Sequence, residues 1–147
     1  MPNLTKPYET FERPGLVVAY KLHAGTHIYK GAAVALNAEG YLVPLGPSTA
    51  GLRFVGVAGE SVDNTGGASG AKTANVTKSG SFVMKAATGE TPAAAQLGSV
   101  VYAASDWECQ TTAGVLTNPY AVGTAVGLET TSTGVVGYRV RIDNHTV

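Results

Sequence analysis

Charged side chains are scarce in this 147-residue chain, where they make up 14% of the sequence. An average soluble domain carries about 25%. A surface with so few solvated charges has less to keep it apart from other proteins. The shortage therefore indicates a component of an assembly whose surface is partly covered.

A basic patch is also missing. The 10 Lys and Arg residues balance the 10 Asp and Glu residues, and no stretch concentrates the positive charges. Binding to nucleic acid through its phosphates needs a basic face. We therefore expect no nucleic-acid partner, and a role in lining or packaging DNA is disfavoured.

The chain has a single cysteine, Cys109, so no intrachain disulfide can form. Its neighbour Glu108 is an acid where an activated thiol needs a cation, which favours a small apolar strand residue over a reactive thiol. The first residues lack the apolar segment of a signal peptide, and no window approaches the roughly 20 apolar residues of a membrane span. The expectation is a protein made in the cytoplasm with no membrane partner.

Glycine, by contrast, is abundant, and its 19 residues separate short runs of β-branched and aromatic residues. The spacing of these runs is typical of a β-sandwich or barrel, and no βαβ rhythm is present. The expected fold is all-β, with one β-sandwich or β-barrel-like domain over residues 16–147. Strands are expected at 16–23, 32–36, 41–45, 52–60, 73–78, 81–87, 99–104, 107–111, 120–128 and 137–142.

A short connector helix is expected between two of these strands. Thr91 would cap it, Pro92 suits the first helical position, and residues 93–97 continue it for about one turn before Gly98. A single turn has little stability of its own, so the segment would serve only as a connector.

The first 15 residues carry three prolines and no periodicity, which predicts an extended N-terminal arm. Leu4, Tyr8 and Phe11 give this arm apolar anchor points. We expect these three residues to contact a neighbouring subunit. The alternative is a disordered tail.

The glycine pattern also recurs within the chain. The matches are residues 31–35 with 98–102, residues 55–58 with 122–125, and Gly70 and Val76 with Gly134 and Val140. This recurrence predicts an internal duplication, with β units at about 16–88 and 98–142. The alternative is that any β protein rich in Val, Gly and Ala aligns with itself.

No motif satisfies the requirements of catalytic or cofactor chemistry. Residues 66–73 (GGASGAKT) fit a phosphate-binding loop, except that Ala71 takes the place of the last glycine and strand-like residues follow. His23 and His27 have no third metal ligand nearby in the sequence. The scattered acids and serines form no general acid–base pair or nucleophile elbow. We expect no enzymatic activity, no cofactor and no metal.

Three segments carry a resemblance to a known family: residues 30–44, residues 54–58 (FVGVA) and residues 62–72, which contain VDNTGG and GAK. They are similar to the head decoration, stabilisation or cement proteins that tailed phages encode near the capsid gene. The resemblance extends over roughly residues 16–142. It departs at 107–109 (Trp-Glu-Cys), where a plainer turn is usual.

The resemblance implies a β-sandwich or β-barrel-like domain that forms a homotrimer. Such trimers bind the outer surface of an icosahedral shell of HK97-type major capsid protein, at three-fold and quasi-three-fold positions. They join neighbouring capsomers and stabilise the expanded head. The implied partners are the major capsid protein and further copies of the chain, and the implied location is the virion. Leu4, Tyr8 and Phe11 would then be capsid or subunit contacts.

A second function stays open because Trp107 is accompanied by seven tyrosines. Aromatic rings stack on sugars, although they more often fill a β core or an interface while their polar tips stay in water. The alternative is therefore a carbohydrate- or host-surface-binding β-module of a phage particle.

Overall fold

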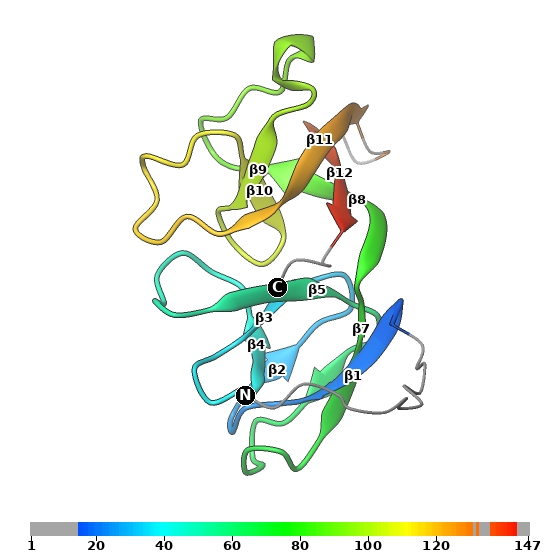
Figure 1. Cartoon of the computed structure of the whole chain (residues 1–147), viewed down its shortest axis with the longest axis vertical. Coiled ribbons are helices and arrows are strands. Elements are labelled where there is room, and N and C mark those ends of the chain that lie inside the picture. Colours follow the sequence, from blue (N-terminus) through cyan, green and yellow to red (C-terminus); the bar gives the residue numbers. More distant parts are fainter. Residues whose placement is uncertain (1–14, 131, 133–135, 144–147) are drawn as a thin grey trace, which may run out of the picture.

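A computed structural model describes residues 15–130, 132 and 136–143 of the chain. The regular elements of these residues are strands, apart from one 3-10 turn. The strands belong to two units that lie one above the other in Figure 1, with β5 of the first unit beside the second. The all-β fold predicted from the sequence is confirmed.

Five strands of the first unit form one antiparallel sheet in the order β1-β7-β5-β3-β4. A parallel bridge between Leu22 and Leu42 joins the two ends of this sheet, so it curls into a nearly closed barrel. Two further strands, β2 and β6, pair with each other. The strands of this unit are β1 (Val17–Lys21), β2 (His27–Ile28), β3 (Ala33–Leu36), β4 (Leu42–Pro44), β5 (Arg53–Ala58), β6 (Val62–Asp63) and β7 (Thr73–Thr77).

The second unit is a closed barrel in the order β10-β8-β12-β11-β9. Its pairs are antiparallel except for β8 and β10, which run parallel with Ala86 opposite Cys109. The elements of this unit are β8 (Ser79–Ala86), the 3-10 turn η1 (Ala94–Gln96), β9 (Val100–Ala103), β10 (Glu108–Gln110), β11 (Ala121–Thr130) and β12 (Val136–Asp143).

The two units share one topology. Strands β1, β7, β5, β3 and β4 correspond in order to β8, β12, β11, β9 and β10, and the pairing sense agrees at every step. The register agrees as well, because Val34 lies opposite Gly56 as Val101 lies opposite Gly123, each pair beside a β-bulge. The glycine recurrence in the sequence therefore falls on equivalent positions of two similar barrels.

Close strand approach explains why glycine occupies two of these positions. A Cβ atom on Gly123 would lie 2.2 Å from the carbonyl oxygen of Arg141, and one on Gly56 would lie 2.2 Å from that of Thr77. No side chain can be accommodated at such distances without moving a neighbouring strand. The same steric requirement therefore acts at the same place in both units.

The two interiors are filled by complementary residues at three equivalent, buried positions. These are Leu22, Leu42 and Ala74 in the first unit, and Ala86, Cys109 and Tyr138 in the second. The first unit uses two large side chains and one small one, and the second uses two small side chains and one large one. Packing at crystal-like density tolerates such exchanges when the total volume is kept.

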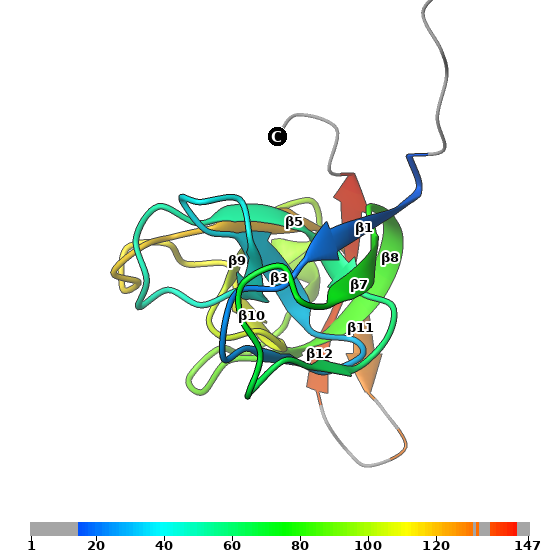
Figure 2. The same ribbon diagram turned by 90° about the horizontal axis from the view of Figure 1, so that it is seen from below.

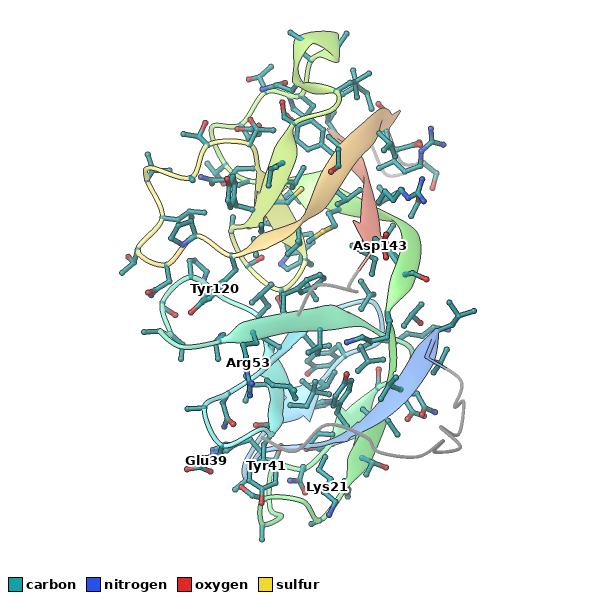
Figure 3. All side chains as sticks on the ribbon, viewed as in Figure 1. Lys21, Glu39, Tyr41, Arg53, Tyr120 and Asp143 are labelled. Atoms are coloured by element: carbon teal, nitrogen blue, oxygen red, sulfur yellow. The ribbon has the colours of Figure 1, made fainter. Side chains whose placement is uncertain are left out.

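A shared apolar cluster joins the units. Its first-unit members include Ala33, Ala35, Phe54 and Val57 on the outer side of β3 and β5, and its second-unit members come from the barrel interior. At the edge of this junction the hydroxyl of Tyr120 (Figure 3) accepts the Leu52 N–H at 3.1 Å and donates to the Thr49 carbonyl at 2.6 Å. Figure 2, which looks along the stack, shows the strands of the two units overlapping.

The boundary between the units differs from the one predicted at residues 88–98. The sequence pattern places β8 in the first unit, after a turn at Ser79 and Gly80. In the structure β8 pairs with β12 and β10, so the second unit begins with β8. A hairpin turn and a crossing between two sheets both need a local break, which Gly80 supplies with a φ of +132°. The sequence around Gly80 therefore could not distinguish a hairpin turn from a crossing between two sheets.

The connector helix is shorter than predicted and begins later. η1 is a 3-10 turn of three residues, and Ala93 with its extended backbone occupies the N-cap instead of Thr91. The side chain of Gln96, at the third position of the turn, accepts the Ala93 N–H at 2.6 Å. The strands β2 and β6 were not predicted, because two-residue strands leave no periodicity to detect.

Candidate functional site

The glycine-rich loop after β6 borders a hollow of about 420 Å³. Its polar groups bond mainly within the loop. The Asp63 carboxylate accepts the Thr65 N–H at 2.9 Å and also the Thr65 hydroxyl, as expected for a turn-forming aspartate. These bonds, more than the nearby His27, lower the pKa of Asp63. The carboxylate therefore serves first to hold the loop.

Asn64 is the buried centre of this loop. Its amide donates to the His23 carbonyl at 3.0 Å and to the Ala68 carbonyl at 3.1 Å, which ties the loop to the end of β1. Its Oδ1 atom has no hydrogen-bond partner and lies against Gly67, where an added Cβ would come within 2.0 Å. Gly67 is thus needed for packing around Asn64.

The sequence resembling a phosphate-binding loop forms part of the same hollow. Lys72 Nζ donates to the Asp63 carbonyl at 2.5 Å, and Thr73 begins β7. The helix whose N-terminus a phosphate-binding loop requires is replaced by a strand, as predicted. The lysine is used to close the loop.

The two histidines of the described chain lie against aromatic rings. His27 stacks on Tyr29 with ring centroids 4.1 Å apart and its Nδ1 lies 3.9 Å from Asp63. His23 packs edge-on against Tyr41 at 6.4 Å. Over residues 15–130, 132 and 136–143, no group of three or more His, Cys, Asp or Glu side chains could hold a metal ion.

Cys109 is fully buried in β10. Burial, and after it the negative charges of Glu90 and Glu108, raises the pKa of the thiol to about 12. The thiol is therefore protonated near neutral pH, which disfavours a role as a nucleophile. Its place at the position equivalent to Leu42 agrees with the predicted role as a small apolar strand residue.

Glu90, which no sequence motif singles out, organises part of the second unit. Glu90 Oε1 accepts the hydroxyl of Tyr138 at 2.7 Å, and the hydroxyl and backbone N–H of Thr111 at 2.8 and 3.2 Å. Burial, followed by the bond to Glu90, raises the pKa of Tyr138. This cluster ties the segment after β8 to β10 and β12, so its role is structural.

Apolar side chains gather on the outer face of β9 and β11, which we call the β9–β11 face. Val100 lies opposite Thr124 in the strand pairing, and a hydrogen bond of 2.8 Å from Gly98 N–H to the Ala125 carbonyl joins the segment after η1 to β11. Leu97, Val100 and Val126 are 43%, 45% and 41% exposed. The members of this face are Leu97, Val100, Tyr102, Ala121, Thr124 and Val126.

A second exposed apolar group is Trp107, beside β10. Its side chain is 53% exposed, and Lys85 Nζ lies 4.6 Å from the ring centre. The same Nζ is 2.9 Å from Glu108 Oε1. A cation over the ring restricts stacking of a ligand on that side.

The arm residues Leu4, Tyr8 and Phe11 lie outside the described residues. The part of the chain that the structure describes has no helix long and apolar enough to cross a membrane. The sequence matches no model of a known protein family, no curated protein and no solved structure. The β9–β11 face, with three exposed large apolar side chains, is the candidate site considered below.

Proposed function

We propose that this chain is a structural virion protein: a head decoration, or cement, protein that binds the outer surface of an HK97-type major capsid lattice as a homotrimer and stabilises the expanded head. The observation that carries the proposal is where the resembling segments lie. Residues 30–44 contain the β3–β4 hairpin, residues 54–58 lie in β5, which pairs with β3, and residues 62–72 contain β6 and its loop. The resembling segments thus all lie in the first unit.

The surface chemistry supports a binding role over a catalytic one. Several polar groups hold loops and strands together: Asp63 and Lys72 close one loop, and Glu90 joins three segments of the second unit. The low charge content leaves apolar side chains in contact with water. Such a surface favours association with other proteins.

The mechanism follows from mass action. A protein that binds the expanded lattice more tightly than the immature one shifts the equilibrium toward the expanded shell. Each copy needs only a modest contact, because symmetry repeats the contact and a trimer engages several capsid subunits at once. An N-terminal arm over residues 1–15, anchored by Leu4, Tyr8 and Phe11, would add a strand-like contact to a neighbour.

The test is binding to expanded capsids that lack the protein. Purified chain should co-sediment with expanded capsids, bind unexpanded capsids weakly, and restore resistance to heat and low salt. Deleting residues 2–14 should abolish capsid binding or trimer formation. Failure of the full chain to bind expanded capsids would overturn the proposal, and a truncated chain that binds fully as a trimer would remove the arm from it.

The exposed ring of Trp107 favours the alternative, a carbohydrate- or host-surface-binding module. That function predicts that the isolated chain binds host glycans and that Trp107→Ala abolishes this binding. The decoration function predicts that Trp107→Ala leaves capsid binding unchanged. Glycan titration of the two proteins therefore separates the functions.

A further inference from the structure

The β9–β11 face is exposed although the equivalent face of the first unit is buried. Val100 and Thr124, paired across β9 and β11, correspond to Ala33 and Val57, paired across β3 and β5. Ala33 is 1% exposed and Val57 5% exposed, whereas Val100 is 45% exposed. The two units thus present the same face, and the described part of the chain covers only one of them.

The next pair along the strands shows the same contrast. Ala35 lies opposite Phe54 in the first unit, and Tyr102 lies opposite Ala121 in the second. Ala35 and Phe54 are buried, Tyr102 is half-buried and Ala121 is exposed. The difference therefore extends along the face and is not a property of one residue.

The second unit covers the face on β3 and β5 of the first unit. Ala33 N–H donates to the Asp106 carbonyl at 2.6 Å, and the Tyr120 hydroxyl bonds to the backbone of Leu52 and Thr49. The chain therefore shows how this face is covered. The second unit packs on the face of the first unit through the surface that carries Asp106 and Tyr120.

The first unit has a surface equivalent to the one that carries Asp106 and Tyr120, and this equivalent surface is exposed. Glu39 and Arg53 occupy the positions equivalent to Asp106 and Tyr120, both are exposed, and they lie on the same flank of the first unit (Figure 3). Within the described residues, the β9–β11 face of the second unit therefore has no cover, and the Glu39–Arg53 flank of the first unit covers no face. A second copy of the chain supplies both.

We propose that the β9–β11 face is the self-association surface of this chain, and that its occupant is the Glu39–Arg53 flank of a second copy. The contact is heterologous, because two different surfaces meet, and such contacts form rings when the rotation closes. The inference rests on the proposed function, for which it names the contact that builds the homotrimer. Ala121 in place of Phe54, and Arg53 in place of Tyr120, make this contact weaker than the one inside the chain.

The experiment measures self-association of the full chain by sedimentation velocity over a range of concentrations. Val100→Asp places a charge in the middle of the face and should raise the dissociation constant by about tenfold or more. Val83→Asp is the matched control, since Val83 is a strand residue of the same unit with 51% exposure and lies outside the face. It should associate like the wild type.

A second variant guards against loss of folding. Leu97→Asp lies on the rim of the face, next to η1 and outside any strand, and should weaken association while the circular dichroism spectrum stays unchanged. The assignment is overturned if Val100→Asp and Leu97→Asp, both folded, associate like the wild type. It is also overturned if Val83→Asp dissociates equally, or if the wild-type chain stays monomeric at every concentration.

Mixing two variants tests the heterologous geometry. Arg53→Asp should by itself prevent association through the opposite surface. A mixture of Arg53→Asp and Val100→Asp retains one intact surface on each chain, so it should form dimers but nothing larger. No dimer in the mixture would overturn the pairing of these two surfaces. Val100→Asp and Leu97→Asp variants that bind capsids as trimers like the wild type would refute this inference alone, whereas a trimer that binds no capsid would refute the proposed function alone.

Discussion

Replacing Gly123 by alanine should destabilise the protein strongly, because β11 and β12 approach too closely there for a side chain. The new Cβ would lie 2.2 Å from the Arg141 carbonyl oxygen and 3.0 Å from a methyl carbon of Val140. An ordinary contact needs a separation about 1 Å larger than the first of these. The strands must therefore move apart, and backbone hydrogen bonds between them must lengthen or break.

The size of the effect follows from these contacts. Loss of two ladder hydrogen bonds costs about 2 kcal/mol, at about 1 kcal/mol each. Strain from overpacking adds about 1–3 kcal/mol. The lower entropy of the unfolded alanine variant returns about 0.4–1 kcal/mol. The expected net loss in the free energy of unfolding is about 3 kcal/mol, a large part of the about 5–15 kcal/mol that stabilises a typical domain.

Urea unfolding followed by circular dichroism measures this loss. Gly114→Ala is the control, because an added Cβ there meets no atom within 4 Å, and its free energy of unfolding should stay within about 0.5 kcal/mol of the wild type. Gly56→Ala, at the equivalent place in the first unit, should cost at least as much as Gly123→Ala, because its φ of +144° adds backbone strain. A Gly123→Ala variant as stable as the Gly114→Ala control would refute the close approach of the strands.

Three further substitutions or conditions test the loops, the thiol and the junction. Gly67→Ala should cost about 1–3 kcal/mol in urea unfolding, because its Cβ would press on the buried Asn64, whereas Gly66→Ala, with no atom within 4 Å, should cost little. The raised pKa of Cys109, about 12, means that the folded state keeps a proton that the unfolded state loses near pH 9, so stability should fall as the pH rises above 9. Cys109→Ala should flatten that fall, and an unchanged slope would contradict the assignment. Tyr120→Phe should cost about 1–2 kcal/mol and speed hydrogen exchange of the backbone amide that donates to its hydroxyl, and an unchanged exchange rate would argue against that bond.

The sequence predicted the all-β class because strand runs and turn residues alternate over most of the chain. The match of residues 55–58 with 122–125 also located Gly56 and Gly123, where any side chain would clash with a neighbouring strand. It did not predict that β8 crosses into the second unit. That pairing depends on contacts with β12 and β10, which are distant in sequence from the turn at Gly80.

The candidate surface was harder to find from the sequence than the fold. Val100 and Ala33 both occupy apolar strand positions, and only the tertiary arrangement buries one and exposes the other. The arm residues Leu4, Tyr8 and Phe11 stay a prediction, because they lie outside the described residues. The Glu90 cluster escaped notice because its partners Thr111 and Tyr138 come from distant strands.

A reconstruction of expanded capsids incubated with the purified chain tests the proposed function most directly. The proposal predicts additional density on the outer surface at the three-fold and quasi-three-fold positions, as trimers in which each copy contributes two stacked barrels. The trimer contact should bring the β9–β11 face of one copy against the Glu39–Arg53 flank of the next. Capsids without added density, or with density only away from the three-fold positions, would contradict the proposal.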